Sequence, residues 1–420
     1  MARAFTFVHA ADIHLDTPYR RHDESTRARL RDAGREAFVR LVDLAIEVQA
    51  HALLIAGDFF DNDWLTIATE RLVVDELRRI TAAGVTVVYA TGNHDPGRAN
   101  YRAMQIDWPS KRFHLIRSHV PESIAIDSDG EPVGWVVGAG HQTPREEENL
   151  AADFPPAPGP QPAVALLHTQ VEGTASVALH DRYAPSTTAD FEHKGYRYWA
   201  LGHIHQPQRV HDDPLAWYAG NLQGRHFDET GAKGALLVSL PAAGEPQVEF
   251  RALAPVRWDV LALENLRDVA TGTEIAHRAA AAFRVLSGHD DVLPDQEWLL
   301  RIDLSGPCRL APTLRDDEAQ AELAEILRDD LGVLDVDLRL RELHSPVEVE
   351  EHRGQEHLLG QTLSLLAAAR TDDLALKAIT PSDLAGIDRA EADGLRGYLR
   401  ELLEGLDVAA AEALLREPAP

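Results

Sequence analysis

The sequence predicts an α/β domain over residues 1–253, a small α+β domain over 254–344 and a helical region over 345–420. Two observations favour the α/β class: apolar, β-branched runs alternate with stretches of helical periodicity, and short polar motifs follow several of the runs. The initial β-α-β-α-β order predicts parallel pairing in the first half of the sheet. After Val85 the strands come closer together, so we expect antiparallel strands to enter there.

Eight apolar runs are the predicted strands of the first domain. They are residues 5–10, 52–56, 85–90, 113–117, 135–138, 163–168, 198–202 and 234–240. Helical periodicity fills 27–49 and 64–83. The proline-rich stretch 151–162 cannot form a regular element and is predicted to be a surface loop within the domain.

A second break near residues 253–255 precedes the small α+β domain. Its predicted elements are strands at 256–264, 298–304 and 336–340 and helices at 265–286 and 313–331. From Ser345 the sequence is helical and strongly charged, and its clearest amphipathic stretches are 358–369 and 390–403. Packing on a core is the default reading of the apolar side of the first stretch, and docking to a partner is the alternative.

Composition limits the class of protein. The chain has 420 residues, of which 45% are apolar and 26% charged, as in ordinary soluble proteins. A run of 18 apolar residues is lacking, so no membrane-spanning helix is predicted. Cys308 is the single cysteine, which excludes an internal disulfide and a thiolate metal cage. Because the residues after Met1 also lack the pattern of a secretory signal, we expect a cytoplasmic protein.

The chain is strongly acidic. Its 68 acidic and 41 basic residues give a formal net charge of −27. Such a chain repels polyphosphate backbones at long range, so binding to nucleic acid would need a local basic patch or bound cations. Solubility is the simplest explanation of the charge.

Five short polar motifs each stand at or just after the end of a predicted strand. They are Asp12-Ile13-His14, Gly57-Asp58, Gly92-Asn93-His94-Asp95, His168 and Gly202-His203-Ile204-His205. Sites form at the carboxyl edge of strands in open α/β sheets, so the five segments are expected to converge on one crevice. Each motif alone is weak evidence, because a lone histidine or a Gly-Asp pair is more often structural. The prediction of one site therefore rests on the occurrence of all five motifs in this order, each at or just after the end of a predicted strand.

The residue types in these motifs are metal ligands. Carboxylate, imidazole and amide oxygen suit Mn²⁺, Fe²⁺ or Zn²⁺. In extended backbone, residues i and i+2 face the same side, so Asp12 is expected to point with His14, and His203 with His205. Seven candidates are too many for one ion, and two ions roughly 3.5–4 Å apart that share a carboxylate would use them all. The seven are Asp12, His14, Asp58, Asn93, His168, His203 and His205.

The ordered motifs resemble the signature of the calcineurin-like metallophosphoesterases over residues 5–205. The stretches 9–19, 53–61 and 218–238 are similar to the SbcD-type DNA repair nucleases, and most of all to their YhaO branch. The resemblance implies a four-layer β-sandwich flanked by helices, α+β by strict class, followed by an α+β capping domain.

The resemblance also implies the roles of the site residues. Two divalent ions, expected to be Mn²⁺, would take Asp12, His14 and His205 at the first site, Asn93, His168 and His203 at the second, and Asp58 as the bridge. His94 would act on the phosphate without binding a metal, Asp61 would orient it, and Asp95 would support the ligands from behind.

Further basic, amide and aromatic residues are candidates for binding substrate. They are Asn221, Arg225, His226, Tyr19 and Arg98, with Arg20, Arg21, Tyr101 and Arg102 nearby in sequence. Arg225 could bind a phosphate through two hydrogen bonds. The alternative is a set of exposed loop residues whose charges are solvated.

Three functions remain open at this stage. The first is a two-metal DNA nuclease in repair, a 3′–5′ exonuclease with some single-strand endonuclease activity. The second is a phosphodiesterase or phosphatase that acts on small molecules or proteins, and the third is a scaffold that recruits an ATPase. The resemblance implies DNA and a coiled-coil ATPase of the SbcC type as partners, with residues 345–420 as the docking element, and it suggests a homodimer.

Overall fold

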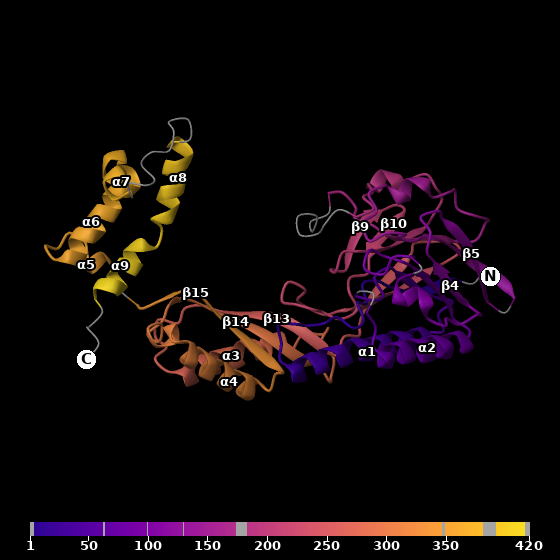
Figure 1. Ribbon diagram of the computed structural model, residues 1–420, viewed down its shortest axis with the longest axis horizontal. Coiled ribbons are helices and arrows are strands. Elements are labelled where there is room, and N and C mark those ends of the chain that lie inside the picture. Colours follow the sequence, from indigo (N-terminus) through magenta and orange to yellow (C-terminus); the bar gives the residue numbers. More distant parts are fainter. Residues whose placement is uncertain are drawn as a thin grey trace. The chain divides into compact units, whose positions relative to one another are not determined.

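The computed structural model describes residues 4–61, 64–98, 100–128, 130–173, 183–346, 349–380 and 392–415 (Figure 1). The chain divides into two compact units. The first comprises Met1–Asp259 and Ser287–Leu300, and the second comprises Val260–Leu286 and Arg301–Pro420.

The first unit contains a mixed six-stranded sheet in the order β12-β11-β1-β2-β3-β4. Its strands are β1 (Phe5–Ala10), β2 (Ala52–Ala56), β3 (Thr86–Ala90), β4 (Phe113–Ile116), β11 (Gly234–Leu240) and β12 (Gln247–Ala252). Strands β1 to β4 pair in parallel, as predicted, while β11 pairs antiparallel with both β1 and β12.

A second six-stranded sheet has the order β5-β6-β7-β8-β10-β9. Its strands are β5 (Glu122–Ser128), β6 (Glu131–Ala139), β7 (Ala163–His168), β8 (Tyr198–Gly202), β9 (Gln208–Asp212) and β10 (Leu215–Tyr218). The four central strands pair in parallel, and the edge strands β5 and β9 pair antiparallel with their neighbours. The expected antiparallel strands after Val85 are therefore present: β5 and β9 at the edges of the second sheet, and β11 and β12 at one end of the first.

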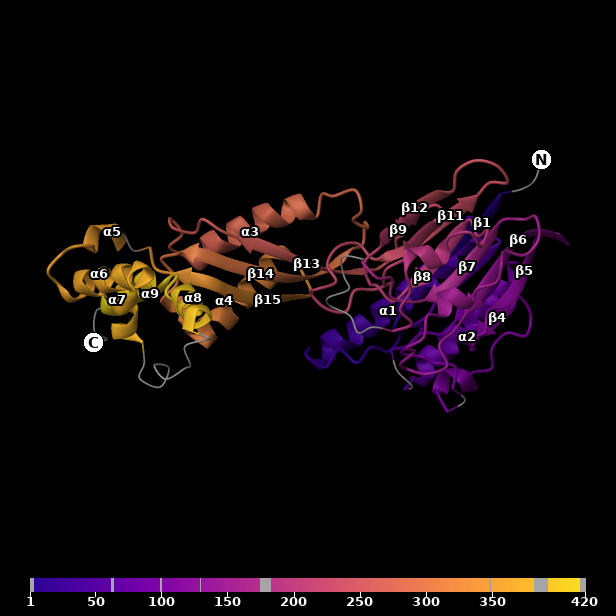
Figure 2. The ribbon, with the colours of Figure 1, turned by 90° about the horizontal axis from the view of Figure 1, so that it is seen from above.

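Successive side chains along the strands of the first sheet belong to two different hydrophobic cores. Val8 and Ile55 belong to the core shared with α1 (Glu24–Glu47) and α2 (Ile67–Ala82), where Phe38 and Leu77 lie. Successive side chains of a strand point to opposite faces. Phe7, for example, belongs to the core shared with the second sheet. Figure 2 shows α1 and α2 on one side of the paired sheets.

The outer face of the second sheet is covered by irregular chain. Short 3₁₀ turns, Leu150–Asp153 and Thr188–Phe191, contact each other there, and Phe154 packs with Trp199 in the core beneath. The order of layers is thus helices, sheet, sheet and turns. The predicted two-sheet fold flanked by helices is confirmed, with a fourth layer made of short turns.

The strands β13 (Val256–Leu263), β14 (Glu297–Pro307) and β15 (Asp335–His344) form a three-stranded sheet. Helices α3 (Gly272–Leu286) and α4 (Asp317–Leu331) contact each other, and α4 contacts β15. The helix predicted from residue 265 is wrong in its first seven residues, because Asn265 has φ 57° and regular helix begins only at Gly272.

The C-terminal part of the second unit is helical, as predicted. It contains α5 (Val349–His352), α6 (Leu358–Thr371), α7 (Asp373–Ile379), α8 (Ala392–Leu402) and α9 (Leu406–Leu414). Residues 390 and 391 of the predicted stretch 390–403 lie outside the described residues. Buried Leu363 and Ala411 join α6 to α9, and Leu376 and Leu403 belong to a second small core. Across the described chain, every helix is too short or too polar to cross a membrane.

Candidate metal centre

The predicted motifs converge at the carboxyl ends of strands from both sheets. Asp12, Asp58 and Asn93 follow β1, β2 and β3 of the first sheet, while His168 ends β7 and His203 follows β8 of the second. The two sheets pack face to face, so these ends meet. The seven candidate ligands are therefore drawn together from five segments that are distant in sequence.

The local backbone is not extended, contrary to the prediction. Asp12 has φ 50°, His14 has φ 47° and His203 has φ 109°, which are left-handed values that residues with a Cβ seldom adopt. Turns held by cross-strand hydrogen bonds direct these side chains instead: the Asp12 amide donates to the Gly57 carbonyl at 3.1 Å and the His14 amide to the Asp58 carbonyl at 3.0 Å. Such strain persists where the surrounding structure enforces it, often at functional sites.

Glycines in the motifs allow the ligands to approach the backbone. A Cβ on Gly57 would lie 2.4 Å from Nδ1 of His168, and Gly57 has φ 85° as well. A Cβ on Gly92 would lie 2.2 Å from Oδ1 of Asp58. Any side chain at either position would displace a candidate ligand.

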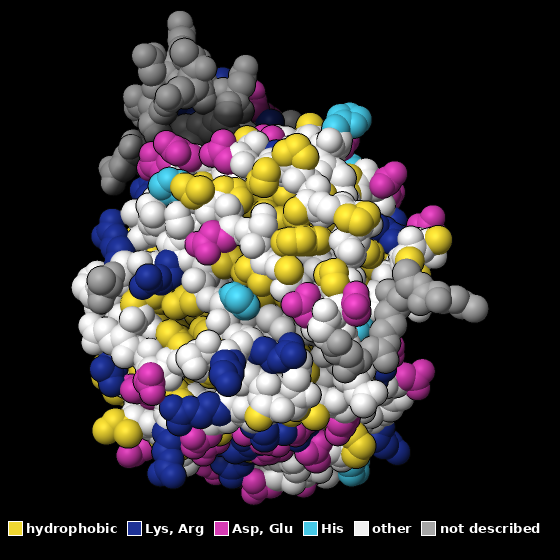
Figure 3. All heavy atoms as spheres, turned by 90° about the vertical axis from the view of Figure 1, so that its right-hand side faces the viewer, with side chains coloured by type: hydrophobic (Ala, Val, Ile, Leu, Met, Phe, Trp, Pro, Cys, Tyr) yellow, Lys and Arg dark blue, Asp and Glu magenta, His cyan; other side chains and the backbone are white. Residues whose placement is uncertain are grey.

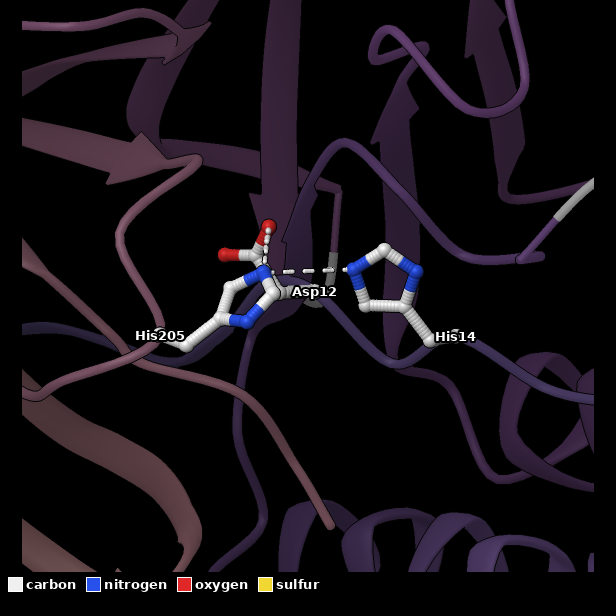
Figure 4. Close-up of side chains that lie close together, drawn as sticks. All are labelled: Asp12, His14 and His205. Carbon is white, nitrogen blue, oxygen red and sulfur yellow. Dashed lines mark hydrogen bonds and ion pairs between the residues drawn. The ribbon is translucent and has the colours of Figure 1, made fainter. Parts of the chain in front are cut away.

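One group of ligand atoms comprises Asp12, His14 and His205 (Figure 4). Nε2 of His205 lies 3.6 Å from Oδ1 of Asp12 and 3.3 Å from Nε2 of His14. Asp12 and His14 are buried, and His205 is partly exposed. The backbone amide of His203 donates to Oδ2 of Asp12 at 3.0 Å, which fixes the carboxylate.

A second group lies around His168. Its Nε2 is 2.9 Å from Oδ1 of Asn93, and its ring centroid is 5.2 Å from that of His203. Nδ1 of His168 is 2.9 Å from the Ala56 carbonyl, which can only accept, so Nδ1 carries a proton and Nε2 is the nitrogen that points toward the other ligands.

Asp58 lies between the two groups. Its Oδ2 is 3.7 Å from Nε2 of His14 and 3.6 Å from Nε2 of His168. Its Oδ1 accepts a hydrogen bond from the His94 amide at 2.9 Å. One carboxylate oxygen is thus nearly equidistant from an imidazole of each group.

The electrostatics of the centre favour a bound cation. Burial raises the pKa of Asp12 well above its usual range, and the nearby charge of Asp58 raises it further. Burial acts in the same direction on Asp58, but the imidazoles of His168, His94 and His14 together hold its pKa below the usual value. Two buried carboxylates with ligand atoms within 4.8 Å of each other repel, and divalent cations are the natural compensation. The donor set of carboxylate, imidazole and amide oxygen fits such ions.

His94 stands beside this centre. Its ring centroid is 4.8 Å from that of His14, and its Nδ1 is 2.6 Å from the main-chain carbonyl of Asp61. The contact that orients His94 therefore comes from the Asp61 backbone. The Asp61 carboxylate lies 2.9 Å from Nη1 of Arg225 and 3.3 Å from Nδ1 of His14.

Asp95 supports the loops from beneath. Its buried carboxylate accepts hydrogen bonds from the amides of Gly92 at 2.8 Å, Phe59 at 2.6 Å and Asp58 at 3.3 Å, and from the Tyr89 hydroxyl. It ties the turn after β2 to the turn after β3, so it holds Asp58 in position.

The candidate substrate residues fall into two sets. Asn221 and Arg225 are drawn into the centre, and the partly exposed guanidinium of Arg225 pairs with Asp61 and Glu229. Tyr19 is buried, and burial raises its pKa. His226 and Arg98 are exposed, and so are the neighbouring Arg20, Arg21 and Arg102. Arg102 pairs with Glu70, whereas Tyr101 is half-buried.

The sequence reasoning missed Glu229 and Lys233. Glu229 lies 2.6 Å from Nδ1 of His205, and Nζ of Lys233 donates to the His205 carbonyl at 2.9 Å. Burial lowers the pKa of Lys233 to about 8. Both residues lie in the stretch 218–238. From sequence alone, an acidic residue and a lysine near a glycine-rich turn are expected to be exposed to solvent.

Comparisons with known proteins agree with this geometry. The family model of calcineurin-like phosphoesterases matches residues 5–207. An uncharacterized metallophosphoesterase, YhaO, from Bacillus subtilis is 31% identical over 268 residues, which cover 63% of this chain and 64% of that protein. The DNA double-strand break repair protein Mre11 from Methanopyrus kandleri is 27% identical over 273 residues, which cover 60% of this chain and 56% of that one. The match thus spans less than two thirds of either relative.

Among solved structures, a dimetal phosphatase from Danio rerio has a TM-score of 0.33 and 14% identity, covering 59% of this chain and 98% of that one. That likeness is too low to bear on function. The family match instead spans every one of the grouped side chains, from Asp12 to His205. Residues 5–207 therefore form a calcineurin-like metallophosphoesterase domain.

Proposed function

We propose that this chain hydrolyses phosphodiester bonds in DNA with two divalent ions, as a 3′–5′ exonuclease with some single-strand endonuclease activity. The observation that carries the proposal is the position of Asp58, whose Oδ2 lies 3.7 Å from His14 and 3.6 Å from His168. A carboxylate oxygen shared between two ligand groups is an arrangement that suits a pair of ions roughly 3.5–4 Å apart.

The proposed division of the ligands is the one that the family resemblance implies, and it is supported by the group of Asp12, His14 and His205 and by the contacts of His168 with Asn93 and His203. Asp12, His14 and His205 would hold one ion, Asn93, His168 and His203 the other, and Asp58 both. Two such ions, for which Mn²⁺ fits this mixed donor set, would neutralise the phosphate oxygens and lower the pKa of a bound water.

His94 is the proposed proton donor to the leaving oxygen. The Asp61 carbonyl accepts from Nδ1, so Nε2 is the nitrogen free to exchange a proton with substrate. The ring is only partly buried and stands beside His14, so it can reach a phosphate at the metal centre. General acid catalysis by such a group contributes about 10²–10⁴-fold to rate.

DNA is the proposed substrate because of the relatives. The Mre11 protein of Methanopyrus kandleri is named for DNA double-strand break repair, and its similarity covers 60% of this chain. The net charge of −27 opposes DNA at long range. On the face in Figure 3, basic side chains are interspersed with acidic ones. Bound cations at the centre would supply the local positive charge that DNA binding needs.

The acidic charge favours the second candidate, a phosphodiesterase or phosphatase for small molecules or proteins on the same metal centre. Parallel assays with Mn²⁺ separate the two: an end-labelled linear duplex and a bis-aryl phosphodiester. We expect cleavage of the duplex from its 3′ ends, abolished by a chelator. Rapid hydrolysis of the aryl ester with an intact duplex would support the small-molecule activity instead.

We further propose that residues 345–420 dock a coiled-coil ATPase of the SbcC type, in line with the nuclease function. Among the described residues, large apolar side chains stay exposed on these helices: Leu358, Leu374, Tyr398 and Leu402. Leu374 is the most exposed of the four at 78%, and the proposal is supported by the four side chains together rather than by any one of them.

Leu374→Asp is expected to weaken association with such an ATPase by at least about tenfold, because a charge would be desolvated at a hydrophobic contact. Surface plasmon resonance with the purified ATPase measures this. Val285→Asp, a matched change at an exposed valine of α3, is the control. Equal affinity for both variants and for a chain truncated at Ser345 would contradict the docking role.

A further inference from the structure

Three histidines of the centre present Nδ1 to an acceptor. Nδ1 of His168 is 2.9 Å from the Ala56 carbonyl, and Nδ1 of His94 is 2.6 Å from the Asp61 carbonyl. Nδ1 of His205 is 2.6 Å from Oε1 of Glu229. The first two acceptors belong to the main chain, whereas the third is a side chain and can be changed by substitution.

The other contacts of Glu229 indicate which nitrogen of His205 carries the proton. Its Oε2 accepts from the Arg225 amide at 2.8 Å and from Nδ2 of Asn221 at 2.7 Å, and both of these groups can only donate. Glu229 is 5% exposed and already serves as an acceptor on that oxygen. The short contact to His205 therefore needs the hydrogen on Nδ1, since two lone pairs at 2.6 Å would repel.

Arg225 competes for the same nitrogen. Its Nη2 lies 3.2 Å from Nδ1 of His205, and a donation from there would place the histidine proton on Nε2. The Glu229 contact is shorter by more than half an ångström, and it is charge-assisted. The guanidinium is also engaged by the Asp61 carboxylate at 2.9 Å. The Nδ1–H form is therefore the favoured one.

The same segment holds the His205 backbone. Nζ of Lys233 donates to the His205 carbonyl at 2.9 Å, and the Asn221 amide donates to it at 3.3 Å. With main chain and ring both held, the remaining nitrogen, Nε2, is directed toward Asp12 and His14 (Figure 4).

We propose that Glu229 is a positioning residue that keeps His205 protonated on Nδ1 and thereby sets the metal affinity of the Asp12–His14–His205 group. The inference rests on the proposed two-metal function. A carboxylate behind a histidine ligand orients the ring and makes its free nitrogen a better donor, and loss of such a partner costs about 10–100-fold in metal affinity.

The tautomer of His205 tests the proposal on the unaltered protein. We expect the metal-free chain, labelled with ¹⁵N-histidine and held at pH 8, to show His205 protonated on Nδ1 in long-range ¹H–¹⁵N spectra. A His205→Gln chain identifies the signal by its loss. A His205 protonated on Nε2 would overturn the proposal, and this measurement needs no variant at position 229.

Glu229→Gln tests the effect on metal binding. The change keeps the volume and removes the charge, and we expect one of two Mn²⁺ ions to bind about 10–100-fold more weakly by isothermal titration calorimetry. Asp228→Asn is the matched control, because it makes the same charge change at a side chain that is 84% exposed. Unchanged affinity in a folded Glu229→Gln chain would overturn the proposal.

Metal binding by the parental chain and by the Glu229→Gln chain distinguishes two outcomes. A parental chain that binds no Mn²⁺ refutes the proposed function and with it the effect of Glu229 on metal affinity. A parental chain that binds two ions and cleaves DNA, with a Glu229→Gln chain of equal affinity, refutes only the role of Glu229.

Discussion

Replacing His94 with alanine is expected to lower phosphodiester turnover by about 10²–10⁴-fold while two metal ions stay bound. Its Nδ1 faces the Asp61 carbonyl, so Nε2 is the nitrogen that can give a proton to the leaving oxygen. The backbone amide of His94, which donates to Asp58 at 2.9 Å, is kept in the alanine variant. Asp58, the candidate bridging ligand, therefore keeps this main-chain hydrogen bond in the variant.

The measurement pairs single-turnover cleavage with elemental analysis of the dialysed protein. His289→Ala, at an exposed histidine outside the motifs, is the control. A variant that keeps parental turnover would show that His94 is not the acid. A variant that loses one ion would instead show that His94 is a ligand. This outcome has to be tested because His94 lies in a group of possible ligand atoms with His14 and Asp58.

The buried strands could be predicted from sequence because both faces are covered. In β2, Leu53 and Ile55 face the core with the helices, and Leu54 faces the second sheet. Such strands are continuous apolar runs that composition alone reveals. The strands that escaped prediction, β5, β9, β10 and β12, are short or stand at sheet edges. In β9, Gln208–Asp212, no residue is fully buried, and its pattern is that of a loop.

The sequence predicted which side chains would gather, but it did not predict the backbone geometry that brings them together. Residue types and their order after strands named the seven side chains that the structure groups. The left-handed backbone at Asp12 and His14 could not be foreseen, since it depends on hydrogen bonds to the turn after β2, more than 40 residues away in sequence. Arg225 illustrates the same limit: its partner Asp61 is 164 positions away, so the sequence could not reveal this ion pair, and a role of Arg225 in binding phosphate stays a prediction.

Asp58→Asn is expected to remove at least one of the two ions and, with it, nearly all turnover. Asparagine keeps the volume and can still accept from the His94 amide through Oδ1, but it lacks the charge that two cations would share. Elemental analysis after dialysis gives the ion count. Asp107→Asn, at a side chain that is 93% exposed, controls for the change in net charge. Two tightly bound ions in the Asp58 variant would contradict the bridging role.

Thermal unfolding of the same variant separates the loss of metal from damage to the fold. Without ions, Asp12 and Asp58 repel in a buried place, where burial and the Asp58 charge raise the pKa of Asp12. Removing the Asp58 charge relieves this repulsion, and it also takes away the charge that the imidazoles of His168, His94 and His14 stabilise. The two effects oppose each other, so we expect only a small change in the Tm of the metal-free chain. Saturating Mn²⁺ at 100 times Kd stabilises the parent by about 2.7 kcal/mol per ion, and the variant should lose this gain for each ion it fails to bind. A metal-free variant with a much lower Tm would instead assign Asp58 a structural role.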